Sequence, residues 1–416
     1  MSAHCPSPRR ELDRTRRGER PVDLRQRACH EADAIAQRLQ ASHPIGRPPQ
    51  SLSGGAAGIA LLHIERASTG HAGWQEAHDW LRAATRDELA AGKGASLYHG
   101  APALAFALHP TPQACYQPTQ ALLDKAVATL TRDRLAAASR RMERSERPVL
   151  AEYDLISGLT GLGAHLWRHA PGDDLIKDVL TYLIRLTEPI DGLPGWWTLS
   201  SAQRTAAAPP GGHGNNGMAH GIAGPLALLA LTARAGLVMP GQLKAIGRIC
   251  AWLDAWQQDH LGAPWWPETI TLAEFQQGRT FQPGPQRPSW CYGTPGLARA
   301  QQLAALATGD TTRRTTAESA LNGCLNDPHQ LRRIIDQSLC HGTAGLFMTV
   351  TAFATDAITP PHLPISRDAE LLLNGPAATN TPPGFLTGLA GYGLALHTLA
   401  HDAAPTTTWD TCLLLR

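Results

Sequence analysis

The stretch CYGTPGLARAQQL, residues 291–303, joins two glycines three positions apart to a run of small and largely apolar residues. Glycine permits backbone angles that other residues rarely adopt, and it lets two backbones approach closely. A segment that is apolar on nearly every side is typical of a helix buried all round. The stretch therefore predicts a buried helix that is entered through a tight turn.

The same element recurs along the chain at intervals of 45 to 72 residues, measured between the first glycines. In six of the seven copies a second glycine follows three positions on, and the second copy has Ala103 there instead. Recurrence of one motif predicts a repeat architecture. The other copies are SGGAAGIALL from Ser53, YHGAPALAFAL from Tyr98, ISGLTGLGAHL from Ile156, AHGIAGPLALLAL from Ala219, CHGTAGLFMTV from Cys340 and LTGLAGYGLAL from Leu386.

Amphipathic segments alternate with these copies. In residues 173–188, for example, Leu175, Val179, Leu183 and Leu186 fall on one face at helical spacing. Buried helices that alternate with amphipathic ones predict an all-α fold, an α/α toroid of seven inner and seven outer helices. The outer helices are expected within residues 29–40, 73–90, 120–141, 173–188, 241–259, 311–326 and 367–375. Strand-like stretches at residues 196–199 and 265–282 are interpreted as loops.

Composition narrows the class of protein. Hydrophobic residues make up 43% of the 416 residues and charged residues 17%, which favours a packed core over disorder. The formal net charge of +2 argues against a nucleic-acid partner, which normally requires a basic face. No apolar run is long enough for a transmembrane segment.

The N-terminal sequence and the cysteines add three further expectations. Residues 1–20 are rich in arginine and lack an apolar core, so a secretory signal is not expected. We expect residues 1–28 to form a flexible arm and residues 29–416 to form a single toroid domain. The eight cysteines are too dilute for a disulfide scaffold, which predicts reduced thiols in the cytoplasm.

Residues just before each inner helix should meet at one end of the barrel, which we call the rim. Copies five and six carry Cys291 and Cys340 two positions before the aligned glycine, and His99, His220 and His341 lie one position before it. Two thiolates and an imidazole favour Zn²⁺, and three protein ligands leave a fourth position open, as in catalytic zinc sites. The alternative is that the cysteines are small buried apolar residues.

Four motifs resemble those of the lanthionine synthetase C-like family, the lanthipeptide cyclases. The resemblance spans residues 54–399 and covers all seven repeats. It implies an α/α toroid that holds one zinc ion per chain through Cys291, Cys340 and His341. The motifs are YDLISGLTG from Tyr153, NGMAHGIAG from Asn216, SWCYGTPG from Ser289 and SLCHGTAG from Ser338. The catalytic residues implied are Asp154, His220, Arg287 and Tyr292.

The implied reaction adds a cysteine thiol of a precursor peptide to a dehydroalanine or dehydrobutyrine in the same peptide. A thiol with a pKa of about 8.5 is a poor nucleophile until it is deprotonated, and zinc would hold it as the thiolate. The addition develops an enolate, and its α-carbon must then receive a proton. We expect His220 to be the general acid and Asp154 to orient it, with Arg287 and Tyr292 contacting the enolate or the peptide.

Each of these residues also has a structural interpretation. Asp154 precedes a helix and is a favourable N-cap residue, Arg287 is typical of a surface loop, and Tyr292 is typical of a core. No family role is carried over to His99. The tryptophan pairs at residues 196–197 and 265–266 either line a peptide groove or pack over the barrel.

The resemblance also implies partners. The substrate would be a dehydrated precursor peptide, made by a separate dehydratase, and a transporter is a further candidate partner. This chemistry belongs to antibiotic biosynthesis in the cytoplasm, either free or peripheral at the membrane through a biosynthetic complex.

Three other classes of protein are alternatives. A prenyltransferase β-subunit needs a carboxylate beside a cysteine, and Asp410–Thr411–Cys412 at the end of the sequence is the nearest case. A toroid glycosidase needs two facing carboxylates, and Asp154 alone is at the rim. A catalytically silent zinc-containing protein of the same fold, binding a peptide or glutathione, is the non-enzymatic alternative.

Overall fold

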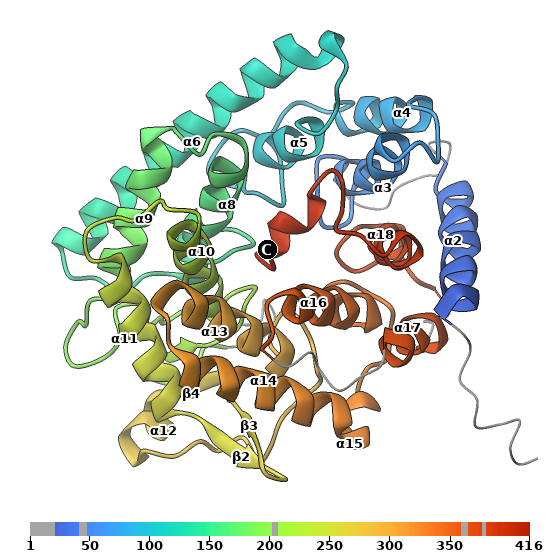
Figure 1. Cartoon of the computed structure of the whole chain (residues 1–416). Coiled ribbons are helices and arrows are strands. Elements are labelled where there is room, and N and C mark those ends of the chain that lie inside the picture. Colours follow the sequence, from blue (N-terminus) through green and yellow to red (C-terminus); the bar gives the residue numbers. More distant parts are fainter. Residues whose placement is uncertain (1–20, 41–47, 202–206, 359–364, 377–379) are drawn as a thin grey trace, which may run out of the picture.

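The computed structural model describes residues 21–40, 48–201, 207–358, 365–376 and 380–416. Its inner ring consists of parallel helices that start at the rim (Figure 1). Six of them begin directly after the aligned glycine, and α10 begins two residues after Gly221. The inner helices are α3 (Ala56–Ser68), α5 (Ala101–Leu108), α8 (Leu159–His169), α10 (Ala223–Arg234), α13 (Thr294–Thr308), α16 (Thr343–Thr355) and α18 (Leu389–His401).

An outer ring of helices wraps the inner ring (Figure 1). In α9 the predicted face is confirmed, because Leu175, Val179, Leu183 and Leu186 are all buried. The α/α toroid with seven inner and seven outer helices is thus confirmed in the described part of the chain. The outer helices are α2 (Pro21–Arg38), α4 (Gln75–Ala84), α6 (Gln117–Glu143), α9 (Asp174–Leu186), α11 (Gln242–Ala255), α14 (Thr311–Asn326) and α17 (Ile365–Asn374).

The prediction of an arm up to residue 28 was wrong at its boundary, because α2 begins at Pro21. Leu24, Ala28, Ala32 and Ile35 repeat at helical spacing and are all buried. This face packs on α18, which explains why the segment is helical. Residues 1–20 of the expected arm lie outside the described residues.

Short elements decorate the loops at the rim. β1 (His213–Asn215) pairs antiparallel with β4 (Thr269–Thr271), and β2 (Gln258–His260) pairs with β3 (Ala263–Trp265). Residues 196–199 contribute only the bridge from Thr198 to His213, whereas residues 265–282 contain β4 and the helix α12 (Leu272–Gln277). The remaining short helices are η1 (Ala114–Tyr116), α7 (Leu150–Tyr153), α15 (Pro328–Leu331) and η2 (Trp409–Leu413).

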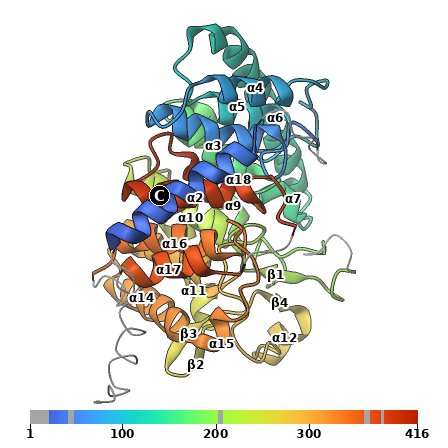
Figure 2. The same ribbon diagram turned by 90° about the vertical axis from the view of Figure 1, so that its right-hand side faces the viewer.

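The C-terminal segment fills the centre of the barrel (Figure 1). Leu413, Leu414 and Leu415 are all fully buried. Figure 2 shows the C-terminus toward one end of the barrel, with β1, β4 and α7 at the other. The rim therefore closes over a filled core, and this plug was not predicted from the sequence.

Side chains from the turns that precede two inner helices bind the backbone of this segment. The Tyr98 hydroxyl donates to the carbonyl of Cys412 at 2.9 Å, and Trp290 Nε1 donates to the carbonyl of Leu413 at 2.9 Å. Because Tyr98 and Trp290 each lie next to a rim residue, the plug reaches the underside of the rim.

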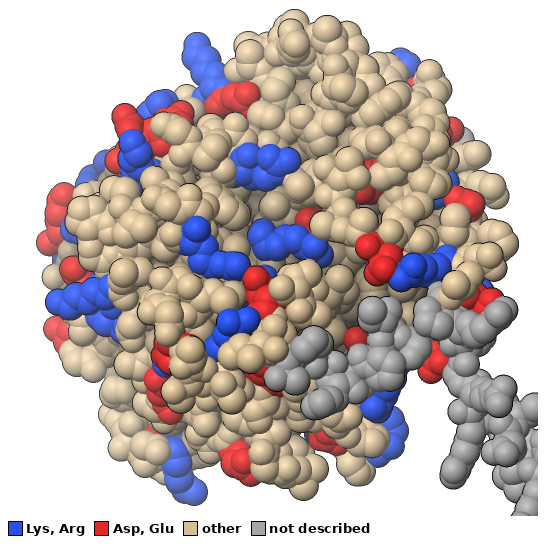
Figure 3. Space-filling model, in the orientation of Figure 1, with Lys and Arg blue, Asp and Glu red and all other residues tan. Residues whose placement is uncertain are grey.

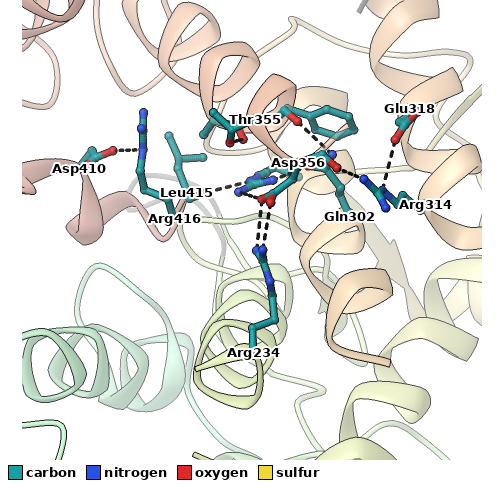
Figure 4. Close-up of polar contacts among 12 residues, drawn as sticks. Arg234, Gln302, Arg314, Glu318, Thr355, Asp356, Asp410, Leu415 and Arg416 are labelled. Carbon is teal, nitrogen blue, oxygen red and sulfur yellow. Dashed lines mark hydrogen bonds and ion pairs between the residues drawn. The ribbon is translucent and has the colours of Figure 1, made fainter. Parts of the chain in front are cut away.

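Ion pairs anchor the segment at the other end of the barrel. Asp356, at the end of α16, binds Arg234 at 2.9 Å (Figure 4). It also binds the buried Arg299 at 2.8 Å. Arg299 Nε also donates to the carbonyl of Leu415 at 2.8 Å, and Arg416 pairs with Asp410. Acidic and basic side chains are interspersed over this face of the molecule (Figure 3). None of the helices in the described ranges combines the length and apolarity needed to cross a bilayer.

Candidate metal centre and active site

Backbone hydrogen bonds join neighbouring repeats at the rim. The amide of Cys291 donates to the carbonyl of Cys340 at 3.2 Å, and the amide of Cys340 donates to the carbonyl of Leu386 at 2.9 Å. Leu386 in turn donates to Ser53 at 2.8 Å, while Ala219 donates to Cys291 at 3.3 Å. All five residues lie two positions before an aligned glycine, so this register converges at one end of the barrel.

The structure brings the three predicted metal ligands together. One ligand atom each from Cys291, Cys340 and His341 lies within 4.8 Å of the other two. Two sulfurs and one imidazole nitrogen are a donor set that suits Zn²⁺. The residues present therefore fit a zinc ion, with room in its coordination for one further ligand.

The electrostatics of this trio differ from those of an ordinary buried thiol. Hydrogen bonds from Cys340 and then from His341 and Ser289 hold the pKa of the Cys291 thiol well below its usual range, although burial opposes them. By contrast, burial raises the pKa of Cys250, on α11, to about 11. Cys291 is thus poised to be a thiolate, the form that binds metal.

Asp336 contacts the ring of His341 and was not predicted from the sequence. Its Oδ2 lies 3.1 Å from Nε2 of His341, which leaves Nδ1 as the nitrogen that can face the sulfurs. This contact, followed by the one with Cys291, raises the pKa of His341 to about 9. A carboxylate behind a ligating histidine fixes the ring and strengthens the ligand. Asp336 lies in the loop before the CHG motif but is not part of any recognisable sequence motif, so no signal in the sequence marks it.

The half-buried His220 pairs with the buried Asp154 beside the metal ligands. Nδ1 of His220 lies 2.6 Å from Oδ2 of Asp154, whose side chain is 2% exposed. Burial lowers the pKa of His220, but the hydrogen bond and charge of Asp154 outweigh it, so the net pKa is raised. The imidazole can therefore be protonated near neutral pH with Nε2–H free to donate.

Tyr292 is held by a residue that the sequence did not single out. Asn215 Nδ2 donates to the Tyr292 hydroxyl at 3.0 Å, and Asn215 Oδ1 accepts from the amide of Gly217 at 3.0 Å. Burial raises the pKa of Tyr292, so its hydroxyl stays protonated and can donate. A Cβ at position 217 would lie 2.7 Å from the tyrosine ring, so glycine is needed there.

Arg287 also lies at the site. It is partly buried, and its Nε has no hydrogen-bond partner among the described residues. Its positive charge lowers the pKa of both Cys340 and His341, although other contacts dominate at each. It also opposes the rise in the pKa of Glu268, a rise caused first by burial and then by Cys291. Glu268 is a second acidic neighbour of the site that the sequence did not reveal.

Other sequence candidates do not join this group. The tryptophan pairs at residues 196–197 and 265–266 are buried, and Trp196 packs edge-on against Trp252 at 5.8 Å. They form core rather than a groove. The sequence also contains two histidine pairs with four-residue spacing, His165 with His169 and His397 with His401. Neither pair lies at the rim positions of the repeat. They lie near the C-terminal ends of α8 and α18.

Comparisons with known proteins show the family and the fold of this chain. The family model described as lanthionine synthetase C-like protein matches residues 48–414. The nisin biosynthesis protein NisC of Lactococcus lactis subsp. lactis is 26% identical over 275 residues, a match that covers 64% of this chain and 64% of NisC. A solved structure of a nisin cyclase is similar with a TM-score of 0.76 at 22% identity, covering 93% of this chain and 96% of that one. At 22% identity, the likeness to this solved structure supports the fold alone.

Proposed function

Because the chain belongs to the lanthionine synthetase C-like family, we propose that it is a zinc-dependent lanthipeptide cyclase, which closes thioether rings in a dehydrated precursor peptide. The observation that carries the proposal is the convergence of Cys291, Cys340 and His341 at the rim, beside the His220–Asp154 pair.

The reaction forms one carbon–sulfur bond and moves one proton. A cysteine sulfur of the peptide bonds to the β-carbon of dehydroalanine or dehydrobutyrine, the double-bond electrons shift toward the carbonyl, and the α-carbon then takes a proton. Cys291, Cys340 and His341 would hold the zinc ion, whose chemistry is to keep the peptide thiol deprotonated at neutral pH.

The remaining residues act on the enolate. His220 is the general acid, because Asp154 holds its Nδ1 and keeps the ring protonated, which leaves Nε2–H for the α-carbon. Tyr292 accepts a hydrogen bond from Asn215 and so directs its own O–H outward, toward developing negative charge. Arg287 adds a positive charge at the same place.

The substrate implies a companion enzyme. A dehydratase must first convert serine or threonine of the precursor to the dehydro residue, and a transporter is a further candidate partner for the product. The free thiols of the described cysteines suit a reducing cytoplasm, where the protein would act free or beside the membrane in a biosynthetic complex.

The alternatives have less support. A metal set of two cysteines and one histidine lacks the carboxylate ligand expected of a prenyltransferase. A catalytically silent protein that binds a peptide or glutathione would not need the acid pair of His220 and Asp154. Their 2.6 Å contact beside the metal ligands favours catalysis.

The test is thioether formation by the zinc-loaded protein on a set of dehydrated lanthipeptide precursors. Ring closure leaves the mass of the peptide unchanged, so loss of free thiol is the readout. We expect His220→Asn to slow closure by about 10²–10⁴-fold. The matched control is His99→Asn, at the same register of another repeat, which should remain close to the unaltered protein. Thiol loss no faster than without protein, or unaffected by His220→Asn, would overturn the proposal.

A further inference from the structure

A second group of metal-ligating side chains lies near the opposite end of the barrel from the rim. His109 follows the C-terminal end of α5, Asp124 lies on α6, and His165 and His169 lie four residues apart near the end of α8. These three helices are neighbours in the toroid (Figure 1). The group therefore joins two inner helices to an outer one.

The ligand atoms of this group converge. One such atom each from His109, Asp124 and His165 lies within 4.8 Å of the other two. Nε2 of His109 is 3.2 Å from Oδ1 of Asp124. The ring of His169 stacks on that of His109, with 3.7 Å between the centroids and 9° between the planes, so His169 covers the group.

Two buried ring nitrogens here have no hydrogen-bond partner among the described residues, Nδ1 of His165 and Nε2 of His169. His165 is 2% exposed. Buried polar atoms are nearly always paired, because an unpaired one costs stability. His165 thus combines an unpaired ring nitrogen with a ligand atom that lies within 4.8 Å of another imidazole and a carboxylate, and a bound metal ion would account for both.

The group is also accessible and in the right protonation state. The side chains of His109 and Asp124 are 21% and 45% exposed, so an ion can enter from solvent. Burial lowers the pKa of His165 to about 3 and also lowers the pKa of His109, so both rings are neutral, the form that binds metal. The charge of Arg168 opposes a cation here, but its guanidinium is bound to the hydroxyl of Thr408 and the Asp124 carboxylate offsets it.

We propose that His109, Asp124 and His165 bind a second divalent transition-metal ion, separate from the rim site. Two imidazoles and one carboxylate suit Zn²⁺ and its neighbours in the first transition row rather than Ca²⁺ or Mg²⁺. The ion would tie α6 of the outer ring to α5 and α8 of the inner ring.

The other histidine group is a weaker candidate. His71, His397 and His401 also have ligand atoms within 4.8 Å of one another. However, Nε2 of His397 and Nδ1 of His71 already contact the hydroxyl of Thr69, at 3.0 Å and 3.2 Å. No carboxylate belongs to that group, and none of its ring nitrogens is among the buried atoms without a hydrogen-bond partner in the described residues.

The test is zinc content per chain after equilibrium dialysis of tag-free protein in a zinc buffer. We expect the unaltered protein to hold one zinc more than His165→Gln. The matched control is His397→Gln, which changes the first histidine of the other pair on an inner helix and should hold as much zinc as the unaltered protein. Cys340→Ala should lose the rim ion and keep the second ion, so the zinc content of the two variants distinguishes the two sites.

Equal zinc in His165→Gln and the unaltered protein would overturn the proposal, as would a loss in His397→Gln instead. Asp124→Asn guards against misfolding of the buried variant, because its side chain is exposed. We expect Asp124→Asn to weaken zinc binding at this site by about tenfold or more, and an unchanged affinity would contradict the assignment.

Discussion

Asp154 serves two groups at once. Its Oδ1 accepts the amide of Ser157 at 2.6 Å, and its Oδ2 binds His220 at 2.6 Å. The first contact holds the turn between α7 and α8, whose N-cap residue is Gly158 and not Asp154, and the second raises the pKa of the imidazole. One buried carboxylate thus fixes both the rim backbone and the proposed general acid.

In Asp154→Asn, the loss of cyclisation activity at alkaline pH should begin at a lower pH than in the unaltered protein. The amide oxygen can still accept from Ser157, but the charge that raises the pKa of His220 is gone, and burial then lowers it. As the proposed general acid, His220 must act in its protonated form, so activity should be lost as pH rises through that pKa. The alkaline limb of the pH–rate profile should move to lower pH, with at least about a tenfold loss of rate at neutral pH. A limb that stays in place in the variant would contradict this role.

The register of the repeat predicted the positions of Cys291, Cys340, His341 and His220, because every rim position follows from one alignment. Asp336 and Asn215 were not predictable in this way. They reach the site from loops whose shape depends on tertiary contacts, and a single acidic or amide residue in a loop carries no periodic signal.

In six of the seven repeats, the second glycine lets the inner helix pack closely against the chain that leads into it. In six copies an added Cβ would lie 1.9 to 2.7 Å from the carbonyl oxygen of the residue six positions earlier. The second copy has Ala103 there, and Gly100 adopts a φ of +75° that the other first glycines with recorded cap angles do not share. That copy therefore enters its helix differently. The six glycines are Gly58, Gly161, Gly224, Gly296, Gly345 and Gly391.

Gly345→Ala should destabilise the protein, because its Cβ would lie 1.9 Å from the carbonyl oxygen of Leu339. We expect a loss of about 1–3 kcal/mol or more in the free energy of unfolding, as for overpacked cores. The control is Gly247→Ala on α11, where nothing lies within 4 Å of the added Cβ. That change should stabilise by about 0.4–1 kcal/mol. Denaturant unfolding of both variants measures the contrast, and equal effects would refute the close-approach argument.

Helical periodicity located the helices well but not all their ends. The outer helix expected within residues 311–326 has those bounds as α14, since Asp310 caps its start. The start of α2 was placed too late, because Arg-rich, polar sequence around Leu24 and Ala28 hides a narrow apolar stripe that only packing on α18 reveals.

At the scale of the whole molecule, the C-terminal segment completes the barrel. Inner helices rich in alanine and glycine leave space on the axis, and Trp409 with Leu413, Leu414 and Leu415 fills it. A short run of leucines has no period that distinguishes core from surface, so the sequence could not assign this role.

Leu415→Ala should cost about 2–5 kcal/mol of unfolding free energy, because the side chain is fully buried on the axis and its loss leaves a cavity. The control is Leu122→Ala on α6, where the leucine is 70% exposed and the change should stay within about 0.5 kcal/mol. Thermal or denaturant unfolding distinguishes the two. A neutral Leu415→Ala would show that the segment does not stabilise the barrel.

Zinc content per chain shows whether Cys291, Cys340 and His341 hold a metal ion at the rim. Elemental analysis would compare the unaltered protein with Cys340→Ala and with Cys250→Ala, a buried cysteine of α11 that serves as the matched control. We predict that Cys340→Ala remains folded and holds one zinc fewer, while Cys250→Ala holds as many as the unaltered protein. Equal zinc in folded Cys340→Ala and the unaltered protein, or none in either, would contradict the account.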